Sequence, residues 1–518
     1  MEIFSFAFIC IVLIGIIIHE IAGCFMPKYQ WSIRLFISLC FYFVLAKFRV
    51  VFIALSALSI WIGAMWLDKL TQDGKTARKA EGLSKDDKKL IKALTTKKKR
   101  VLLWSIIIFN LGILIAVKYV MPVLSHSIIL PLGISFYTFQ ALAYIIDIYG
   151  EKYEPQTNYG KLLLYLSWFP QLIQGPINRY DLIENDLYKT HRLEWDETRE
   201  ALLLFLFGAI KRYIVGDALA PYVDAILGGQ NVDYPGSILL FGAFLFAIEQ
   251  YANFSGGIDM VMGISSLFGV RLNDNFKQPY FSKNLAQFWR RWHISLGAWM
   301  RDYVFYPFAM LKSVQKFTKK ISDKFGAHAG RATTGGIGNL IVFALVGLWH
   351  GPQLHYLAWG LYNGIIIALS DALAPTFEKM RTVLKIKENS KGFILFQIIR
   401  TFMIIVFAGF FDIVGSVSLG IKCFVNTFFD FNIAGFMPII QELYEQNGTS
   451  VKTIVVVALA LVVMLAWSLL RENHIEPTLM ICNFKLPARW AVCYFLMFLL
   501  LYAFSVIGAG GGFMYAAF

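Results

Sequence analysis

Two histidines of this chain stand among apolar and aromatic residues, where ionisable groups are uncommon. His350 follows the apolar run Leu340–Trp349 and precedes Gly351 and Pro352. Because proline cannot continue a helix, we expect His350 at a broken helix end inside a membrane. An ionisable side chain there is costly, which makes it a candidate for function. The alternative is a histidine that only hydrogen-bonds to backbone between helices.

His293 ends a second unusual segment, in which tryptophans and arginines are interleaved. The guanidinium groups of Arg290 and Arg291 suit a phosphate-bearing ligand, and Trp289 and Trp292 suit a membrane interface or a channel wall. An amphipathic helix on the cytoplasmic surface explains the same pattern equally well. His350, farther along the chain, is a second histidine that we expect inside the membrane. Its presence favours a site that the two histidines share.

Other chemistries lack their sequence signatures. His350 and His355 are separated by a proline, without the spacing of familiar zinc sites, and no Cys or acidic residue is adjacent. The chain has no GxSxG motif of a serine hydrolase and no GxxxxGK[ST] phosphate loop. We therefore predict no metal site and no nucleotide hydrolysis.

The elements that hold these residues must lie in lipid. The 518 residues are 57% hydrophobic and 16% charged, with a mean hydropathy of +0.59. A soluble chain has about 25% charged residues, and a helix needs about 20 apolar residues to cross a bilayer. Candidate spans are 3–21, 31–47, 49–67, 101–121, 129–148, 199–215, 236–252, 335–348, 354–373, 393–413, 451–470 and 488–508.

Three segments place Pro, Gly and polar residues within apolar surroundings: 131–137, 169–176 and 347–352. Broken backbone cannot face lipid and survives only against protein or a water-filled cavity. We therefore expect re-entrant or half-membrane helices that line an internal pocket. The sequence predicts an all-α, polytopic protein of about 11–12 transmembrane helices, with one integral-membrane domain over residues 1–518.

The positive charge is concentrated in three loops. The net charge is +14, and Lys and Arg gather at 68–100, 312–331 and 374–400. Such loops stay on the cytoplasmic side and set the orientation, which explains the charge better than nucleic-acid binding does. We expect 68–100 to be a basic cytoplasmic loop that is helical or partly mobile. With this loop inside, the span count predicts that both termini are extracytoplasmic.

Several motifs, in order along the chain, resemble bacterial members of the membrane-bound O-acyltransferase (MBOAT) family. His350 lies in a Gly-Leu-Trp-His-Gly segment of the kind found in this family, and His293 ends Phe-Trp-Arg-Arg-Trp-His. Residues 131–140, 169–180 and 254–260, with Asn275 and Phe276, are also similar. The resemblance is close over residues 110–365, which we take as the core with the catalytic motifs.

The resemblance implies a ring of helices around a central funnel and an activity at the cell envelope. The similar members are alginate-type polysaccharide O-acetylases and teichoic acid D-alanyl transferases. The family's catalytic histidine corresponds to His350, and its second histidine to His293. The predicted substrate-binding residues are Trp289, Arg290, Arg291, Trp292, Trp349 and Gln174.

The reaction that the resemblance implies is acyl transfer across the bacterial cell membrane. A cytoplasmic thioester, either acetyl-coenzyme A or the phosphopantetheine of an acyl carrier protein, is the donor substrate, with no tightly bound cofactor. An outward-facing hydroxyl of an envelope polysaccharide, or an extracytoplasmic transferase that passes the group on, is the acceptor. We expect O-acetylation rather than D-alanylation, with neutral His350 as the general base.

The C-terminal residues carry a further candidate. Residues 508–518 form a Gly-rich, aromatic tail that resembles a terminal motif of envelope MBOAT systems, predicted here to be extracytoplasmic. By that resemblance Tyr515 is an acyl relay on a flexible tether. The alternative is an aromatic anchor at the membrane interface.

Two functions of other classes share part of this pattern. A transporter also uses broken helices around a midplane pocket, but it predicts an inverted repeat and paired intramembrane acids. The sequence shows neither, although Asp147, Asp217, Asp259 and Asp302 are candidates for such acids. A non-catalytic envelope scaffold predicts that His350→Ala has no functional effect.

Overall fold

The computed structural model describes residues 6–120, 131–229 and 233–507. These residues fall into two compact units. The first comprises the described residues up to Leu202 together with Val261–Asn273, and the second comprises Leu203–Met260 together with the described residues from Asp274 onwards. Among the described residues the structure is helical and has no β-strand beyond one isolated bridge, Phe276 to Trp292. The all-α prediction is confirmed.

The first unit is formed mainly by the N-terminal helices. They are α1 (Phe6–Phe25), α2 (Gln30–Ala46), α3 (Val50–Lys79), α4 (Lys85–Ile115), α6 (Ile134–Tyr149), α7 (Tyr159–Ser167), α8 (Phe169–Ile173) and α9 (Tyr180–Tyr188). The boundary between the units falls inside α10 (Trp195–Ala209) and α12 (Gly236–Leu267).

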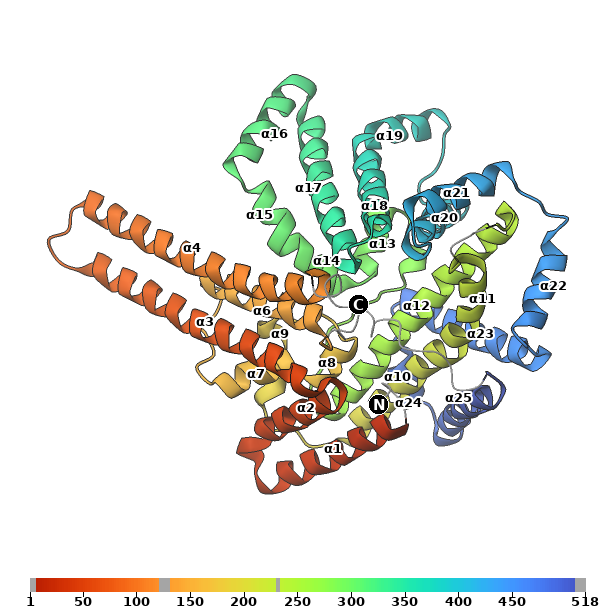
Figure 1. Cartoon of the computed structure of the whole chain (residues 1–518), viewed down its shortest axis with the longest axis horizontal. Helices are drawn as coiled ribbons and strands as arrows, with labels where there is room; N and C mark the ends of the chain where they lie inside the picture. Colours follow the sequence, from red (N-terminus) through yellow and green to blue (C-terminus); the bar gives the residue numbers. More distant parts are fainter. Residues whose placement is uncertain (1–5, 121–130, 230–232, 508–518) are drawn as a thin grey trace. The chain divides into compact units, whose positions relative to one another are not determined.

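Helices α3 and α4 form a long antiparallel hairpin (Figure 1). Ser84 caps α4 by accepting a hydrogen bond from the Asp87 amide, while the Asp87 carboxylate accepts one from the Ser84 amide. Within the hairpin Asn110 accepts a hydrogen bond from Ser56 at 2.6 Å and donates one to Ser59 at 3.0 Å. The predicted loop 68–100 is therefore largely helix, because both helices extend through it to the cap.

Two of the predicted irregular segments lie side by side in this unit. Gly133 has φ +67° and precedes α6, and a Cβ built there would lie 2.8 Å from the carbonyl oxygen of Leu172. Glycine alone suits this position, because it accepts the left-handed backbone and leaves room for the neighbouring chain. The segment around Leu172 is α8, a helix of only five residues.

The second unit holds the rest of the helices. They are α11 (Asp217–Leu227), α13 (Leu285–Arg291), α14 (Ile294–Met300), α15 (Tyr306–Ala309), α16 (Lys312–Phe325), α17 (Ala327–His350), α18 (Leu354–Ala372), α19 (Ala374–Val383), α20 (Lys391–Ile413), α21 (Val417–Phe429), α22 (Phe436–Gln446), α23 (Val451–Glu472), α24 (Pro477–Cys482) and α25 (Leu486–Ile507).

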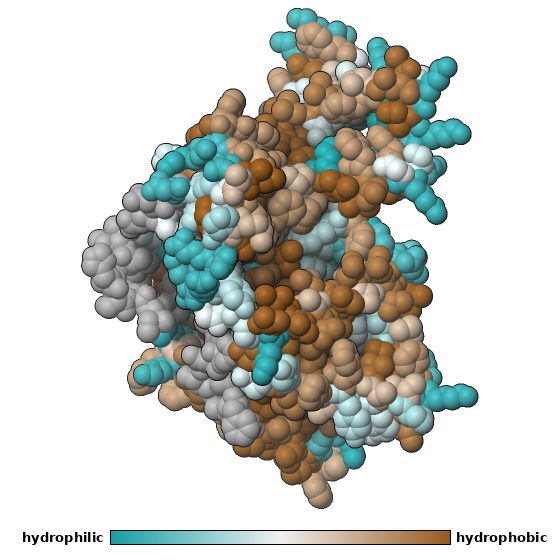
Figure 2. Space-filling view, turned by 90° about the vertical axis from the view of Figure 1, so that its right-hand side faces the viewer, coloured by the Kyte–Doolittle hydropathy of each residue, from teal (hydrophilic) through white to brown (hydrophobic). Residues whose placement is uncertain are grey.

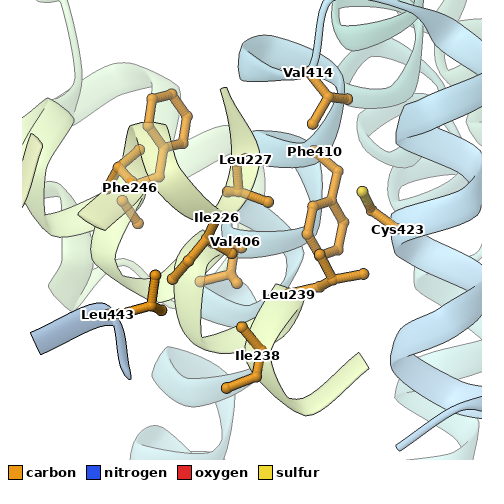
Figure 3. Packing of buried hydrophobic residues seen from close by; sticks show 13 residues of the cluster. Ile226, Leu227, Ile238, Leu239, Phe246, Val406, Phe410, Val414, Cys423 and Leu443 are labelled. Carbon is orange, nitrogen blue, oxygen red and sulfur yellow. The ribbon is translucent and has the colours of Figure 1, made fainter. Parts of the chain in front are cut away.

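A buried hydrophobic cluster joins α11, α12, α20 and α21. Figure 3 shows Phe410 of α20 among Leu227, Leu239 and Cys423, which come from the other three helices. Each of these four side chains is fully removed from solvent. Burying an aromatic ring of this size contributes about 1.5–3 kcal/mol, so the cluster is a main source of stability for the second unit.

Helices α10 and α12 touch through two glycines. A Cβ on Gly208 would lie 2.6 Å from the carbonyl oxygen of Gly256, and a Cβ on Gly256 would lie 2.7 Å from that of Gly208. Just after this contact, α10 passes into the π-helical turn Ile210–Gly216. There the buried Lys211 pairs with Asp259 of α12 at 2.5 Å. The close approach of the two backbones thus brings a buried cation and its partner together.

Helices α17 and α18 also pack through glycines. A Cβ on Gly360 would lie 2.2 Å from the carbonyl oxygen of Phe343, and a Cβ on Gly347 would lie 2.4 Å from that of Tyr356. Small residues at such positions are typical of helix pairs in membranes, because they let the backbones approach closely. This contact places the C-terminal end of α17 directly beside the start of α18.

Eight helical stretches of the described chain are long and apolar enough to cross a membrane, and the bent pair α18 and α19 makes up to nine. One stretch, Pro27–Lys79, contains both α2 and α3, which correspond to two predicted spans. The predicted spans at 129–148 and 199–215 correspond to the shorter helices α6 and α10. Apolar side chains predominate on the face in Figure 2, as expected for a polytopic protein.

The glycine contact between α17 and α18 generates a prediction. We expect Gly360→Ala to lower the unfolding temperature and to impair the function of the chain, because the new methyl group meets backbone that cannot move aside. The loss in stability should be about 1–3 kcal/mol. Thermal unfolding of the purified protein in detergent measures it.

Gly335→Ala is the matched control, since it lies on α17 and its Cβ would meet only the Asp371 carboxylate at 3.9 Å. Alanine is the better helix former, so this variant should be at least as stable as the parent. Equal stability of the two variants would contradict the role assigned to the glycine contact.

Candidate functional site

His350 is the last residue of α17, as the sequence predicts for a broken helix end. Three aromatic rings surround its half-buried imidazole. The ring centroids of Trp349 and Trp359 lie 5.1 and 5.0 Å away in edge-to-face geometry, and that of Tyr356 lies 5.8 Å away in a stacked arrangement. Because Tyr356 and Trp359 belong to α18, the imidazole is held in the corner where the two helices meet.

Gly351 makes the corner possible. Its backbone is extended, and a Cβ there would lie 2.5 Å from Oε1 of Gln353 and 2.7 Å from the ring of Tyr356. A larger residue at this position would collide with the ring that stacks on His350. The chain therefore turns out of α17 immediately after the histidine and enters α18 within a few residues.

His293 lies between α13 and α14, with a left-handed backbone (φ +47°). Its imidazole is buried, and Nδ1 lies 3.2 Å from Nδ2 and 3.3 Å from Oδ1 of Asn275. A backbone hydrogen bond also joins the segment of His293 to that of Asn275, since the Ile294 amide donates to the Asn275 carbonyl at 3.0 Å. The ring of Phe254 covers the imidazole edge-to-face at a centroid distance of 4.9 Å.

The two histidines converge on Trp349. The ring centroid of Trp349 is 6.1 Å from that of His293 and 5.1 Å from that of His350. Burial and, as the smaller cause, the electrostatic interaction with His350 together lower the pKa of His293 to about 3. His293 is therefore neutral at physiological pH, and its imidazole lies within electrostatic reach of the second one.

The predicted substrate-binding tryptophans of the segment before His293 take up different positions. Trp289 is half-buried and donates a hydrogen bond from Nε1 to Asn363 at 3.2 Å, against α18. Trp292 is buried, and it stacks on Phe288 at a centroid distance of 5.5 Å. Both rings pack within the second unit, and their contact with a substrate stays a prediction.

The two arginines of this segment also differ. Arg290 is exposed, whereas the Arg291 guanidinium forms a bidentate ion pair with Glu472 at the end of α23, at 2.7 and 3.1 Å. A fork-to-fork pair of this kind is strong and directional. Arg291 thus anchors the turn that carries His293, whereas the side chain of Arg290 is exposed.

Two predicted site residues, Gln174 and Tyr515, do not belong to the described part of the second unit. Gln174 belongs to the first unit, where it is buried and its Oε1 has no hydrogen-bond partner among the described residues. Tyr515 lies outside the described residues. Their contributions to a site stay predictions.

The acids considered for a transporter each lie next to a basic side chain. Asp259 pairs with Lys211 at 2.5 Å and Asp217 with Arg212 at 4.0 Å. Asp147 pairs with Lys152 at 3.4 Å, and Asp302 with Arg301 at 2.8 Å. Within the described residues these four carboxylates thus have cationic neighbours.

The described part of the chain has no group of three or more His, Cys, Asp or Glu side chains that could hold a metal ion. His355, the histidine nearest to His350 along the chain, is buried instead against α20, where its Nδ1 lies 3.0 Å from the carbonyl oxygen of Phe411. The rings that meet at the site are the imidazoles of His293 and His350 and the indole of Trp349.

Sequence reasoning missed three residues that define the site. Tyr356 and Trp359 pack on His350, and their spacing along one face of α18 after Pro352 is the signal that could have identified them. Asn275 holds His293. Asn275 stands in one of the motifs of the resemblance, but no periodicity of the sequence indicates its contact with His293.

Comparison with known proteins relates the segment that contains both histidines to a protein family. The model of the membrane-bound O-acyltransferase family, MBOAT, matches residues 153–411, half of the chain. Both His293 and His350 lie within the matched range.

Individual relatives agree with this match. The "Probable alginate O-acetylase AlgI" of Pseudomonas fluorescens is 33% identical over 281 residues, 54% of this chain and 52% of the relative. The "Teichoic acid D-alanyltransferase" of Bacillus subtilis is 30% identical over 297 residues, 54% of this chain and 68% of the relative. The "Peptidoglycan O-acetyltransferase" of Helicobacter pylori is 28% identical over 283 residues, 49% of each chain. The matches with the alginate-type relatives span about half of their length. Taken with the helical fold and the extent of the family match, these similarities show that the chain belongs to the membrane-bound O-acyltransferase family.

Proposed function

We propose that this protein is an O-acyltransferase that moves an acetyl group from a cytoplasmic thioester to a hydroxyl of an extracytoplasmic envelope polysaccharide or of its transfer partner. The observation that carries the proposal is the meeting of His293 and His350 beside Trp349 in a chain of the MBOAT family. The donor is acetyl-coenzyme A or an acylated phosphopantetheine, bound as a substrate.

The geometry supports His350 as the general base. It is half-buried at a helix end, so its imidazole is fixed by three rings without being enclosed on all sides. An alcohol is a poor nucleophile at neutral pH, and a neutral imidazole removes its proton as the oxygen attacks the thioester carbonyl. The C–S bond then breaks, and the thiolate takes the proton from the imidazolium.

Acetyl transfer is proposed rather than D-alanyl transfer because two kinds of relative with acetyl in their names are similar to this chain, those named for alginate and for peptidoglycan. The relative named for teichoic acid D-alanylation supports the alternative. Acetate released by mild alkali from envelope polymers, compared between cells with and without this protein, distinguishes the two. Loss of ester-linked D-alanine in place of acetate would establish the alternative.

A single substitution tests the catalytic role of His350. We expect His350→Ala to lower kcat by about 100- to 10,000-fold, the usual contribution of a general base, while the protein remains folded. The measurement is transfer of radiolabelled acetyl from the thioester to polymer by membranes that contain the variant. Its unfolding temperature is measured in parallel.

The control is His328→Ala, which removes a half-buried imidazole from the opposite end of the same helix. This variant should transfer acetyl groups at the parental rate. Parental activity in His350→Ala would instead favour a scaffold, and substrate counterflow without transfer of label would favour a transporter.

Tyr515 provides a separate prediction, since we propose it as the acyl relay of the C-terminal tail. Tyr515→Phe keeps the aromatic ring and removes the hydroxyl that would carry the acyl group. We expect this variant to lose polymer acetylation while still inserting in the membrane, measured by the same alkali-released acetate. Unchanged acetylation would assign Tyr515 to an interfacial anchor.

A further inference from the structure

The side chain of Asn275 has a fixed orientation, because two hydrogen bonds from Ser295 define which atom is oxygen. The backbone amide of Ser295 donates to Oδ1 at 3.0 Å, and its hydroxyl donates to the same atom at 2.9 Å. A backbone N–H can only donate, so the amide of Asn275 cannot be reversed without placing two donors against each other. The two bonds also occupy both lone pairs of Oδ1.

This orientation determines the tautomer of His293. Nδ1 of the imidazole lies 3.2 Å from Nδ2 of Asn275, which can only donate. Nδ1 must therefore accept, and the proton of the neutral imidazole is on Nε2. The opposite tautomer would place an N–H of His293 against the hydrogens of Nδ2 and would require a third hydrogen bond at Oδ1, 3.3 Å away.

The Nε2 atom of His293 is directed at no acceptor in the described part of the chain. It is buried and has no hydrogen-bond partner there. A buried donor without an acceptor is unfavourable, and such groups in native structures often mark a place that a ligand or water occupies. The same imidazole lies next to Trp349, which adjoins His350.

We propose that Asn275 holds His293 as the Nε2–H tautomer and that this N–H donates to the thioester carbonyl oxygen as that oxygen becomes an oxyanion. The inference rests on the proposed function, and it makes His293 an electrophilic donor and Asn275 its positioning residue. In this site His350 then accepts a proton, whereas His293 donates a hydrogen bond.

One base is enough to account for every proton and electron pair in the acyl transfer. The alcohol oxygen forms a bond to the carbonyl carbon, His350 takes its proton, and the π electrons of the carbonyl move onto the oxygen that His293 faces. The oxyanion then re-forms the carbonyl, the C–S bond breaks, and the thiolate receives the proton from His350. His293 keeps its Nε2 proton throughout, as expected for a residue that burial holds neutral.

The first test replaces the imidazole by amides of two lengths. Gln places its amide nitrogen near the position of Nε2, whereas the shorter Asn reaches only the position of Nδ1. We expect His293→Gln to retain kcat within about tenfold of the parent and His293→Asn to lose about 100- to 1,000-fold, the usual effect of removing one oxyanion donor. KM for the thioester should be similar in both. Equal inactivity of two folded variants would overturn the donor role.

The second test reverses the polarity of the positioning residue. Asn275→Asp replaces Nδ2 by an oxygen that accepts from Nδ1–H, which leaves Nε2 as an acceptor. We expect kcat to fall by about 100-fold, with KM for the thioester unchanged. Asn284→Asp is the matched control, because Asn284 is an exposed cap of α13 whose Oδ1 accepts from the Gln287 amide, and Asp caps a helix equally well.

A spectroscopic readout separates this inference from the proposed function. In the full chain labelled with ¹⁵N-histidine, the His293 signals are identified as those missing in His293→Gln. We expect a protonated Nε2 and an unprotonated Nδ1 in the parent, and the reverse in Asn275→Asp. A protonated Nδ1 in the parent overturns the inference whatever the activity. Absence of acyl transfer with any thioester overturns the proposed function, while the tautomer remains measurable.

Discussion

The contact of α17 with α18 is the constraint on which the site depends. Gly347 and Gly360 bring the two backbones so close that no side chain fits between them, and α17 ends at His350 where this contact ends. The ring of Tyr356 stacks on the imidazole and that of Trp359 packs against it edge-to-face, and both residues belong to α18. In a membrane, where water does not drive helices together, close van der Waals packing of this kind is a principal source of association. The position of His350 is therefore a property of the helix pair.

The second histidine is positioned by a different kind of interaction. His293 lies in a turn between two short helices, where backbone hydrogen bonds to Asn275 and the bridge from Phe276 to Trp292 take the place of regular structure. Its left-handed backbone is unusual for a residue that is not glycine, and such strain is tolerated where the surroundings fix a conformation strongly. One site thus combines a rigid helix corner with a hydrogen-bonded turn.

Much of this arrangement follows from local sequence patterns, and the rest depends on contacts distant in the chain. Hydropathy identifies the long spans, and Gly351 with Pro352 predicts the end of α17, because these signals act within one helix. The basic segment 68–100 was expected as a helical or partly mobile loop, and α3 and α4 continue through most of it, since Lys and Arg are good helix formers. The clamp of Asn275 on His293 and the ion pair of Arg291 join residues whose meeting no periodicity indicates.

The pair of Arg291 with Glu472 reaches beyond the range over which the chain matches its family. That range ends at residue 411, whereas Glu472, whose carboxylate pairs with the Arg291 guanidinium, is the last residue of α23. The turn that carries His293 is thus joined to a helix that lies outside the range matched by the family model. A substitution at Glu472, outside the matched range, would therefore act on the geometry around the buried imidazole through this ion pair.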